Sequence, residues 1–216
     1  MADPNEQYIK GKEKIAALFR GKAHGLSSRT CNRLPPGQRL VSSFPVLDLG
    51  VRPTESQAAT WKLTVDGLVE KPMVWTLPEL KKLPNHQQTK DFHCVTRWST
   101  YDHDWVGVLL RTLAEIVQPG PSVDTVLFHS FDGYMTNVAL EEALTDEGMV
   151  AWELDEDDLP ILHGGPIRGL IPQLYGWKSA KFLQRIEFVE GDAPGFWETR
   201  MYNNQGDPWQ EERYAE

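Results

Sequence analysis

Four segments of the chain have the apolar and polar patterning that is typical of β-strands. These segments are residues 60–72, 122–131, 149–155 and 181–191. The last of them, KFLQRIEFVEG, alternates most regularly, so we expect it to lie deep within a sheet. Residues 33–53 have prolines near both ends and little periodicity, which predicts extended irregular backbone.

Other segments have the spacing of apolar residues that is typical of helices. Leucines and an isoleucine recur at helical spacing over residues 107–118, and this helix should end at the Pro-Gly-Pro of residues 119–121. A short helix over residues 76–83 should have Thr76 as its N-cap, with Glu79 completing a capping box. Two more brief helices are expected over residues 13–20 and 139–145. Short helices mixed with short strands, without regular alternation, predict an α+β fold rather than a doubly wound one.

The length of 216 residues suits a single domain. We expect residues 1–30 to form a peripheral N-terminal arm and residues 31–216 to form the domain itself. No apolar run approaches the roughly 20 residues that cross a bilayer, so no membrane span is expected. The N-terminus also lacks the apolar stretch and cleavage site of a secretory signal, which predicts a cytoplasmic protein if the chain is complete.

The formal net charge of −9 repels nucleic-acid phosphate and anionic lipid. Nucleic acid is therefore not expected as a partner, and any anion site must be a local cluster of cations. The acidic run DEDD at residues 155–158 lacks the glycine and the spacing of a calcium-binding hand. It predicts a solvated turn, as most charge runs do.

Two cysteines, Cys31 and Cys94, are too few for a disulfide framework, and neither belongs to a CxxC pair. The histidines lack the paired spacing of a structural zinc site. Within DFHCVTRWST, Cys94 could be a buried core thiol, a nucleophile activated by His93 and Arg97, or a ligand of a soft metal. Neighbouring side chains of a strand point to opposite faces, so His93 should point away from Cys94, which disfavours the nucleophile.

A second unusual segment, LHGGPIRGLIPQLYGWKSAKF, spans residues 162–182. Gly164 and Gly165 would let backbone N–H groups converge on a ligand. Basic residues concentrate around these glycines, namely His163, Arg168, Lys178 and Lys181. Such a loop either binds an anion such as phosphate or only presents its cations to solvent. A metal held by one thiolate and by a bulky anionic cofactor would explain this loop and Cys94 together.

Three motifs together resemble the sulfite oxidase family of molybdenum enzymes, and within it the group similar to the catalytic subunit of the periplasmic methionine sulfoxide reductase. DGLVEKP followed by FHCVTRWS is similar to the stretch around the molybdenum-ligating cysteine of that group. HGGPIRGLIPQLYGWKSAKF resembles the family's HGxPxR, proline, glycine and lysine series, and FWETRMYNNQGDPW resembles its Trp-x-x-Arg-x-Tyr element. The resemblance covers residues 34–214 and implies a mixed, single-domain, sulfite-oxidase-type molybdopterin-binding fold.

The resemblance also implies roles for individual residues. Cys94 matches the cysteine that binds molybdenum, and Tyr202 matches an active-site tyrosine that hydrogen-bonds near the metal oxo group. Arg97 is expected to steer an anionic or polar substrate, or else to contact the pterin or surface acids. The sulfite-binding arginines of the animal enzymes do not align after Cys94, so the resemblance does not imply sulfite as the substrate. The positions that match cofactor contacts are Phe44, Pro45, Val46, Cys94, Ser130, His163, Arg168, Ser179, Ala180 and Lys181.

The implied activity is that of a molybdopterin-dependent oxidoreductase that transfers an oxygen atom to or from a small oxyanion or sulfoxide. Because the sequence has no haem domain or immunoglobulin-like domain of the kind found in the family, electrons are expected to pass through a separate redox partner protein. Two other hypotheses stay open at this point. One is a non-catalytic molybdopterin-binding or carrier protein, and the other is a cofactor-free interaction module with the same fold.

Overall fold

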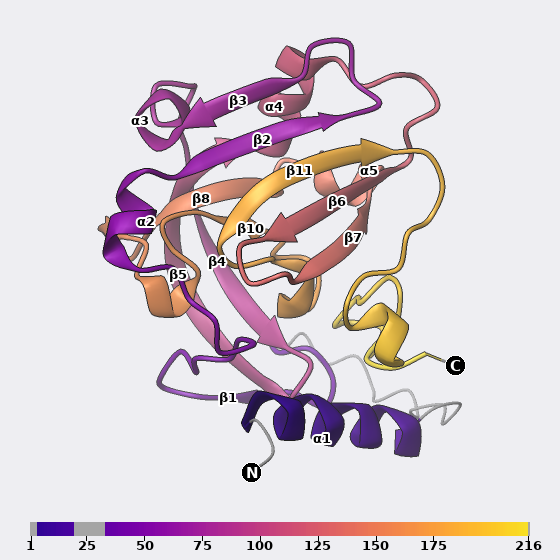
Figure 1. The fold of residues 1–216 in the computed structure, drawn as a ribbon. Helices are drawn as coiled ribbons and strands as arrows, with labels where there is room; N and C mark the ends of the chain where they lie inside the picture. The colour runs from indigo at the N-terminus through magenta and orange to yellow at the C-terminus, as the bar shows by residue number, and fades with distance from the viewer. Residues whose placement is uncertain (1–3, 20–32, 216) are drawn as a thin grey trace.

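The computed structural model describes residues 4–19 and 33–215. Two β-sheets form the body of the molecule, and short helices lie at their ends and edges (Figure 1). Strands and helices are interleaved without regular alternation, which confirms the predicted α+β class. Cys31 lies outside the described residues.

The first sheet carries Cys94. Its strand order is β1–β5–β8–β10, with β4 paired to β5 and β9 paired to β8. The long strand β5 pairs with β1, β4 and β8, so most of this sheet is built on it. The bounds are β1 (Arg39–Leu40), β4 (His86–Cys94), β5 (Trp98–Leu109), β8 (Met149–Leu154), β9 (Asp157–Asp158) and β10 (Arg168–Leu170).

The second sheet has the order β3–β2–β11–β6–β7. Its strands are β2 (Lys62–Gly67), β3 (Met73–Thr76), β6 (Thr125–Ser130), β7 (Met135–Ala139) and β11 (Leu183–Val189). β11 is the central strand, parallel to β2 and antiparallel to β6. Its apolar residues Leu183, Ile186 and Phe188 are buried. The alternating segment therefore lies deep in the sheet, as its pattern predicts.

The helices are short, apart from the N-terminal one. They are α1 (Pro4–Phe19), α2 (Glu55–Ala59), α3 (Leu77–Leu80), α4 (Leu110–Val117) and α5 (Leu140–Ala143), with 3-10 turns η1 (Ile161–His163), η2 (Gly176–Lys178) and η3 (Glu198–Arg200). The capping box of α3 is confirmed: the Thr76 hydroxyl accepts from the Glu79 N–H, and the Glu79 carboxylate accepts from the Thr76 N–H at 2.9 Å. Helix α1 begins well before the helix that we predict over residues 13–20.

Helix α4 begins at Leu110, three residues later than its apolar spacing predicts. Residues 107–109 instead complete β5, where Gly107 pairs with Ala151 of β8. Within residues 33–53, regular structure is limited to the two-residue strand β1, which confirms the expected irregular backbone. Tertiary pairing thus decides the boundary between strand and helix here.

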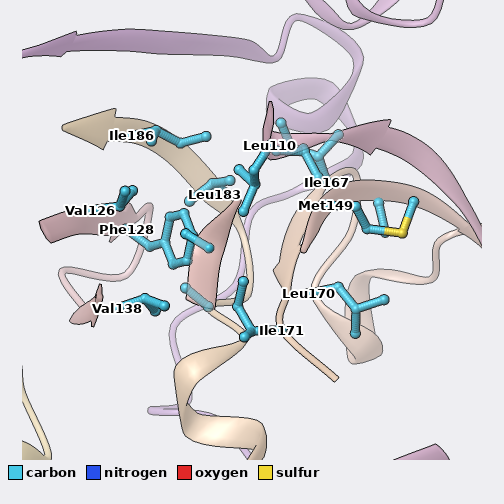
Figure 2. Close-up of a cluster of buried hydrophobic side chains, with 14 of the residues drawn as sticks. Leu110, Val126, Phe128, Val138, Met149, Ile167, Leu170, Ile171, Leu183 and Ile186 are labelled. Atoms are coloured by element: carbon cyan, nitrogen blue, oxygen red, sulfur yellow. The ribbon is translucent and has the colours of Figure 1, made fainter. Parts of the chain in front are cut away.

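One core lies between the two sheets (Figure 2). Phe128 and Ile186 from the second sheet and Met149 and Leu170 from the first are fully buried. Burial of such a side chain stabilises the fold by roughly 1.5–3 kcal/mol relative to exposure. This core holds the ends of β4, β10 and η2 in fixed positions around the region of Cys94.

The acidic run at residues 155–158 is exposed. Asp155 and Glu156 form the turn, with φ angles of 53° and 71°, and Asp157 and Asp158 pair with β8 as β9. Across residues 4–19 and 33–215, no group of three or more His, Cys, Asp or Glu side chains is placed to hold a metal ion. In the same part of the chain, no helix combines the length and the apolar character needed to cross a membrane.

Candidate functional site

Cys94 is the last residue of β4, and a three-residue loop connects it to β5. The Arg97 N–H donates to the Cys94 carbonyl at 3.0 Å, and Cys94 pairs with Trp98 across the hairpin. Arg97 has a φ of 71°, the left-handed conformation that closes many three-residue hairpin loops. The loop leaves the Cys94 Sγ 3.1 Å from the Thr96 Oγ1, and only 9% of the cysteine surface is exposed.

Cys94 lines a cavity with about 780 Å³ of empty space, part of it open to solvent. Aromatic side chains from distant parts of the chain form much of the wall. Eight of the residues predicted from the sequence meet here, namely Phe44, Pro45, Cys94, Ser130, Arg168, Ser179, Lys181 and Tyr202. The fold therefore brings the cysteine motif, the glycine-rich motif and the C-terminal motif to one place.

His93 lies outside this cavity lining. Its Nδ1 is 2.8 Å from the Ser99 Oγ, and burial lowers the pKa of His93 to about 4. Neighbouring positions of a strand point to opposite faces, so this placement is the one that the alternation predicts. The histidine next to Cys94 in sequence is not placed to act as its general base.

Arg168 of β10 contributes a buried guanidinium to the cavity. It donates to the carbonyls of His163 and Ser179, each at 2.8 Å, and lies over the Phe92 ring at 5.2 Å. Burial lowers the pKa of Arg168 to about 9. Within residues 4–19 and 33–215 it has no carboxylate partner. A buried cation without an acid is costly, so this position favours an anionic ligand.

Lys181 lies beside Arg168 in the cavity wall. Its Nζ donates to the Leu162 carbonyl at 2.7 Å and is 3.8 Å from the Asp48 carboxylate. Burial, followed by the charge of Arg168, lowers the pKa of Lys181 to about 7. Gly164 has a φ of 106°, and a Cβ there would lie 2.8 Å from the Lys181 Cγ. Only glycine allows the loop to approach the lysine this closely.

His163 stacks on Phe44, with ring centroids 4.5 Å apart, and stands behind the cavity wall rather than in it. Burial lowers the pKa of His163 to about 4, and the charges of Lys181 and Arg168 add to the shift. The buried Nδ1 of His163 and the buried Oγ of Ser130 have no hydrogen-bond partner among the described residues. Buried polar atoms of this kind usually have a partner. Ser130 lines the cavity, so its Oγ is open to a ligand there.

Lys178 does not belong to the cationic part of the cavity, contrary to the sequence-based interpretation of its loop. Its Nζ is 2.7 Å from the Glu198 carboxylate and donates to the Asn137 carbonyl at 2.8 Å, and both ionic side chains are buried. Glu198 also accepts from the Trp177 Nε1 at 2.8 Å. The pair therefore fixes the ring of Trp177, which forms one wall of the cavity.

Tyr202 closes the cavity next to two tryptophans. Its ring stacks on Trp197 and meets Trp177 edge-on, with both centroid distances at 5.0 Å. Burial raises the pKa of Tyr202, and Tyr214 and Cys94 raise it further. The hydroxyl therefore stays protonated at neutral pH and is able to donate a hydrogen bond.

Three other predicted residues do not line the cavity. Arg97 is exposed at the hairpin loop, with its guanidinium beside Gly37, so its position does not support a role in steering substrate. Val46 is 36% exposed. Ala180 is buried behind the wall, where its carbonyl accepts from the Gly169 N–H at 2.9 Å.

Helix α1 contributes to the cavity in a way that the sequence patterns do not indicate. Tyr8 and Lys12 of this helix line the cavity together with Cys94, although we expect residues 1–30 to form a peripheral arm. Their spacing of four residues puts them on one helical face. That signal is present in the sequence, but it does not show which part of the domain the face would meet.

The residues present fit an anionic cofactor that also binds a metal through one sulfur. Arg168 and Lys181 would neutralise a phosphate, and Ser130 offers a partnerless hydroxyl in the cavity wall. Cys94 alone could not hold a bare metal ion, because no His, Cys, Asp or Glu group in residues 4–19 or 33–215 completes such a site with it. The cofactor itself would have to supply the other metal ligands.

Comparison with known families matches residues 49–197 to the oxidoreductase molybdopterin binding domain. The match spans more than half of the chain and contains Cys94, Arg168 and Lys181. The chain belongs to this family. It is a molybdopterin-dependent oxidoreductase, and its cofactor is the molybdenum–molybdopterin that the sequence motifs imply.

Curated relatives of this oxidoreductase differ in how much of their length it spans. The uncharacterized oxidoreductase YuiH of Bacillus subtilis (strain 168) is 39% identical over 92% of this chain and 99% of the relative. A putative protein-methionine-sulfoxide reductase subunit of Azospira oryzae is 33% identical over 69% of this chain and 56% of the relative. The protein-methionine-sulfoxide reductase catalytic subunit MsrP of Campylobacter jejuni is 29% identical over 68% of this chain and 54% of the relative. The chain thus spans about half the length of the sulfoxide reductase relatives.

Among solved structures, the oxidoreductase is similar to the sulfane dehydrogenase SoxCD of Paracoccus pantotrophus. The TM-score is 0.58 at 21% identity, over 64% of this chain and 40% of that one. This similarity confirms the sulfite-oxidase-type fold.

Proposed function

We propose that this oxidoreductase transfers an oxygen atom to or from a small oxyanion or sulfoxide, with Cys94 as the molybdenum ligand. One observation carries the proposal: the buried thiol of Cys94, the buried guanidinium of Arg168 and the half-buried ammonium of Lys181 line the same cavity. When bound, the molybdenum cofactor would supply the oxygen-atom transfer and the change of oxidation state. The chain supplies binding, orientation and charge.

Different residues around the cavity would bind, orient and neutralise the cofactor. Arg168 is suited to a bidentate contact with a phosphate, and Lys181 to a point charge beside it. Both have pKa values lowered by burial, and a bound phosphate would raise them again because it favours the charged forms. Phe44 stacked on His163 would form a flat wall for the pterin.

Other side chains face the reacting end of the cavity. The Tyr202 hydroxyl would donate a hydrogen bond to an oxygen of the substrate, since its raised pKa keeps it protonated. Trp177 and Trp197 would exclude water around it, which strengthens that hydrogen bond. Thr96 lies within hydrogen-bonding distance of the Cys94 sulfur and would help to hold it in position.

The names of two relatives support a sulfoxide substrate and a separate redox partner. The proteins of Azospira oryzae and Campylobacter jejuni are both named as subunits of a protein-methionine-sulfoxide reductase. A subunit works with at least one other chain, so we propose that the present protein also exchanges electrons with a partner protein.

The test begins with metal content. Wild type and Cys94→Ser are produced in a host that makes the molybdenum cofactor, and molybdenum is measured per chain. Wild type should carry about one molybdenum, and Cys94→Ser should lose most of it, because a hydroxyl is a poor ligand where a thiolate is needed. Wild type without molybdenum, or equal molybdenum in both proteins, would refute the assignment of Cys94.

An activity assay distinguishes an enzyme from a non-catalytic carrier of the cofactor. Loaded wild type should reduce dimethyl sulfoxide with reduced methyl viologen or oxidise sulfite with ferricyanide. A loaded protein that does neither would instead be the non-catalytic carrier.

A further inference from the structure

Helix α1 forms the outer wall of the cavity that contains Cys94. Tyr8 and Lys12 point from one face of α1 and line the cavity with the cysteine. Figure 1 shows α1 across the end of the molecule to which the β4–β5 hairpin leads. The helix therefore lies where a substrate would approach the proposed metal ligand.

Contacts with Trp197 and Arg200 hold α1 in place. The Glu13 carboxylate pairs with the Arg200 guanidinium at 3.0 Å, and Tyr8 meets Trp197 edge-on, with centroids 6.4 Å apart. Tyr8 and Ile9 also pack against the core. These contacts place α1 next to the segment that ends at Tyr202, the proposed hydrogen-bond donor to substrate.

Lys12 differs from the other cations of the cavity. Arg168 and Lys181 donate to backbone carbonyls, whereas no hydrogen bond or ion pair ties Lys12 to residues 4–19 or 33–215. Its Nζ lies over the Tyr8 ring, 5.1 Å from the centroid. Lys12 is half-buried in the cavity wall, and this burial lowers its pKa. A half-buried ammonium beside a cavity is suited to binding an anionic oxygen.

We infer that Lys12 is a specificity-determining residue that binds an anionic oxygen of the substrate, and that α1 restricts the cavity to small anions. The assignment of a substrate rests on the proposed function, but anion binding at Lys12 can be measured without turnover. A small oxyanion would give Lys12 the partner that it lacks within the described chain. A neutral sulfoxide would gain less from this contact because it carries no net charge.

The experiment uses molybdenum-loaded protein, so that the proposed phosphate site is filled by cofactor. Inorganic sulfate is titrated while tryptophan fluorescence is followed, because Trp177 and Trp197 line the cavity. Lys12→Gln should raise the sulfate Kd at least about tenfold, and Lys12→Arg should stay within about threefold of wild type. Lys10→Gln is the matched control, since Lys10 is an exposed lysine of α1 that pairs with Glu6, and it should change the Kd less than about twofold.

The outcomes separate the two proposals. Wild type without molybdenum would refute the proposed function before any titration. Loaded wild type that binds no sulfate, or a Lys12→Gln protein that binds it as tightly as wild type, would refute only the role of Lys12. Equal losses in Lys10→Gln and Lys12→Gln would point to general charge attraction and would also overturn it. If Lys12→Gln does not fold by circular dichroism, Lys12→Met takes its place in the same titration.

Discussion

The two walls of the cavity are built in different ways. The inner wall consists of the β4–β5 hairpin loop and residues 162–182, and it is continuous with the sheets and their backbone hydrogen bonds. The outer wall is α1, which docks through side chains of a few residues. The inner wall is therefore held by backbone pairing, whereas the outer wall depends on a few side-chain contacts. Under the two proposals above, the cofactor would be held by the sheets and their loops, and helix α1 would select the substrate.

The largest effect is expected for Arg168→Met in the inner wall. Loss of the buried guanidinium should lower molybdopterin per chain at least about tenfold, because the phosphate loses a charged, bidentate partner. Bound pterin is measured by fluorescence after its oxidation and release. Arg185→Met is the control, since Arg185 is a part-exposed arginine of β11 paired with Asp66 and Glu187, and it should retain the cofactor. Equal cofactor in the two variants would contradict the phosphate role of Arg168.

Gly164→Ala tests whether the inner wall depends on close backbone approach. The new Cβ would lie 2.8 Å from Lys181 and would need a φ of 106°. We expect a loss of about 3 kcal/mol in the free energy of unfolding, measured in urea. Gly133→Ala adds a Cβ at a φ of 82° with no atom within 4 Å, so it should cost only about 1 kcal/mol. Equal costs would show that the contact with Lys181 is unimportant.

A smaller effect on stability is expected from the titration of His93, the buried histidine that precedes Cys94 in β4. The pKa of His93 is about 4 in the folded protein and about 6.5 when unfolded, so the unfolded chain binds more protons between these values. Stability should therefore fall as pH falls below about 6.5, by about 2 kcal/mol between pH 7 and pH 5. Urea unfolding at pH 7 and pH 5 should show a smaller change in the free energy of unfolding for His93→Gln than for wild type. The same difference in both proteins would mean that other groups cause it.

Local patterns in the sequence predict much of the fold and the basic part of the inner wall. Alternation identifies β11, a capping box identifies α3, and the glycine-rich motif identifies the region of Arg168 and Lys181. Arg97 shows why local pattern is insufficient for the rest. It is three residues from Cys94, but a left-handed φ at the hairpin loop puts its side chain outside the cavity. The sequence does not specify that turn.

The outer wall is harder to predict for a different reason. The spacing of Tyr8 and Lys12 shows that they share a helical face, but docking depends on contacts with Trp197 and Arg200, almost 190 residues away in sequence. Lys178, within residues 162–182, also depends on a residue from a distant part of the sequence. Its charge is evident in the sequence, but the buried Glu198 that neutralises it comes from another motif.

Glu13→Gln should have the smallest effect on stability and tests the comparison most directly. The ion pair of Glu13 with Arg200 is part-exposed, so its loss should lower the free energy of unfolding by less than about 1 kcal/mol. Amide hydrogen exchange should nevertheless become faster in α1 and stay unchanged in β4, because the helix opens without unfolding the sheets. Glu6→Gln, which removes only the exposed pair with Lys10, should leave α1 as protected as in wild type. Faster exchange in β4 as well would mean that the two walls open together and that α1 is part of the folded core.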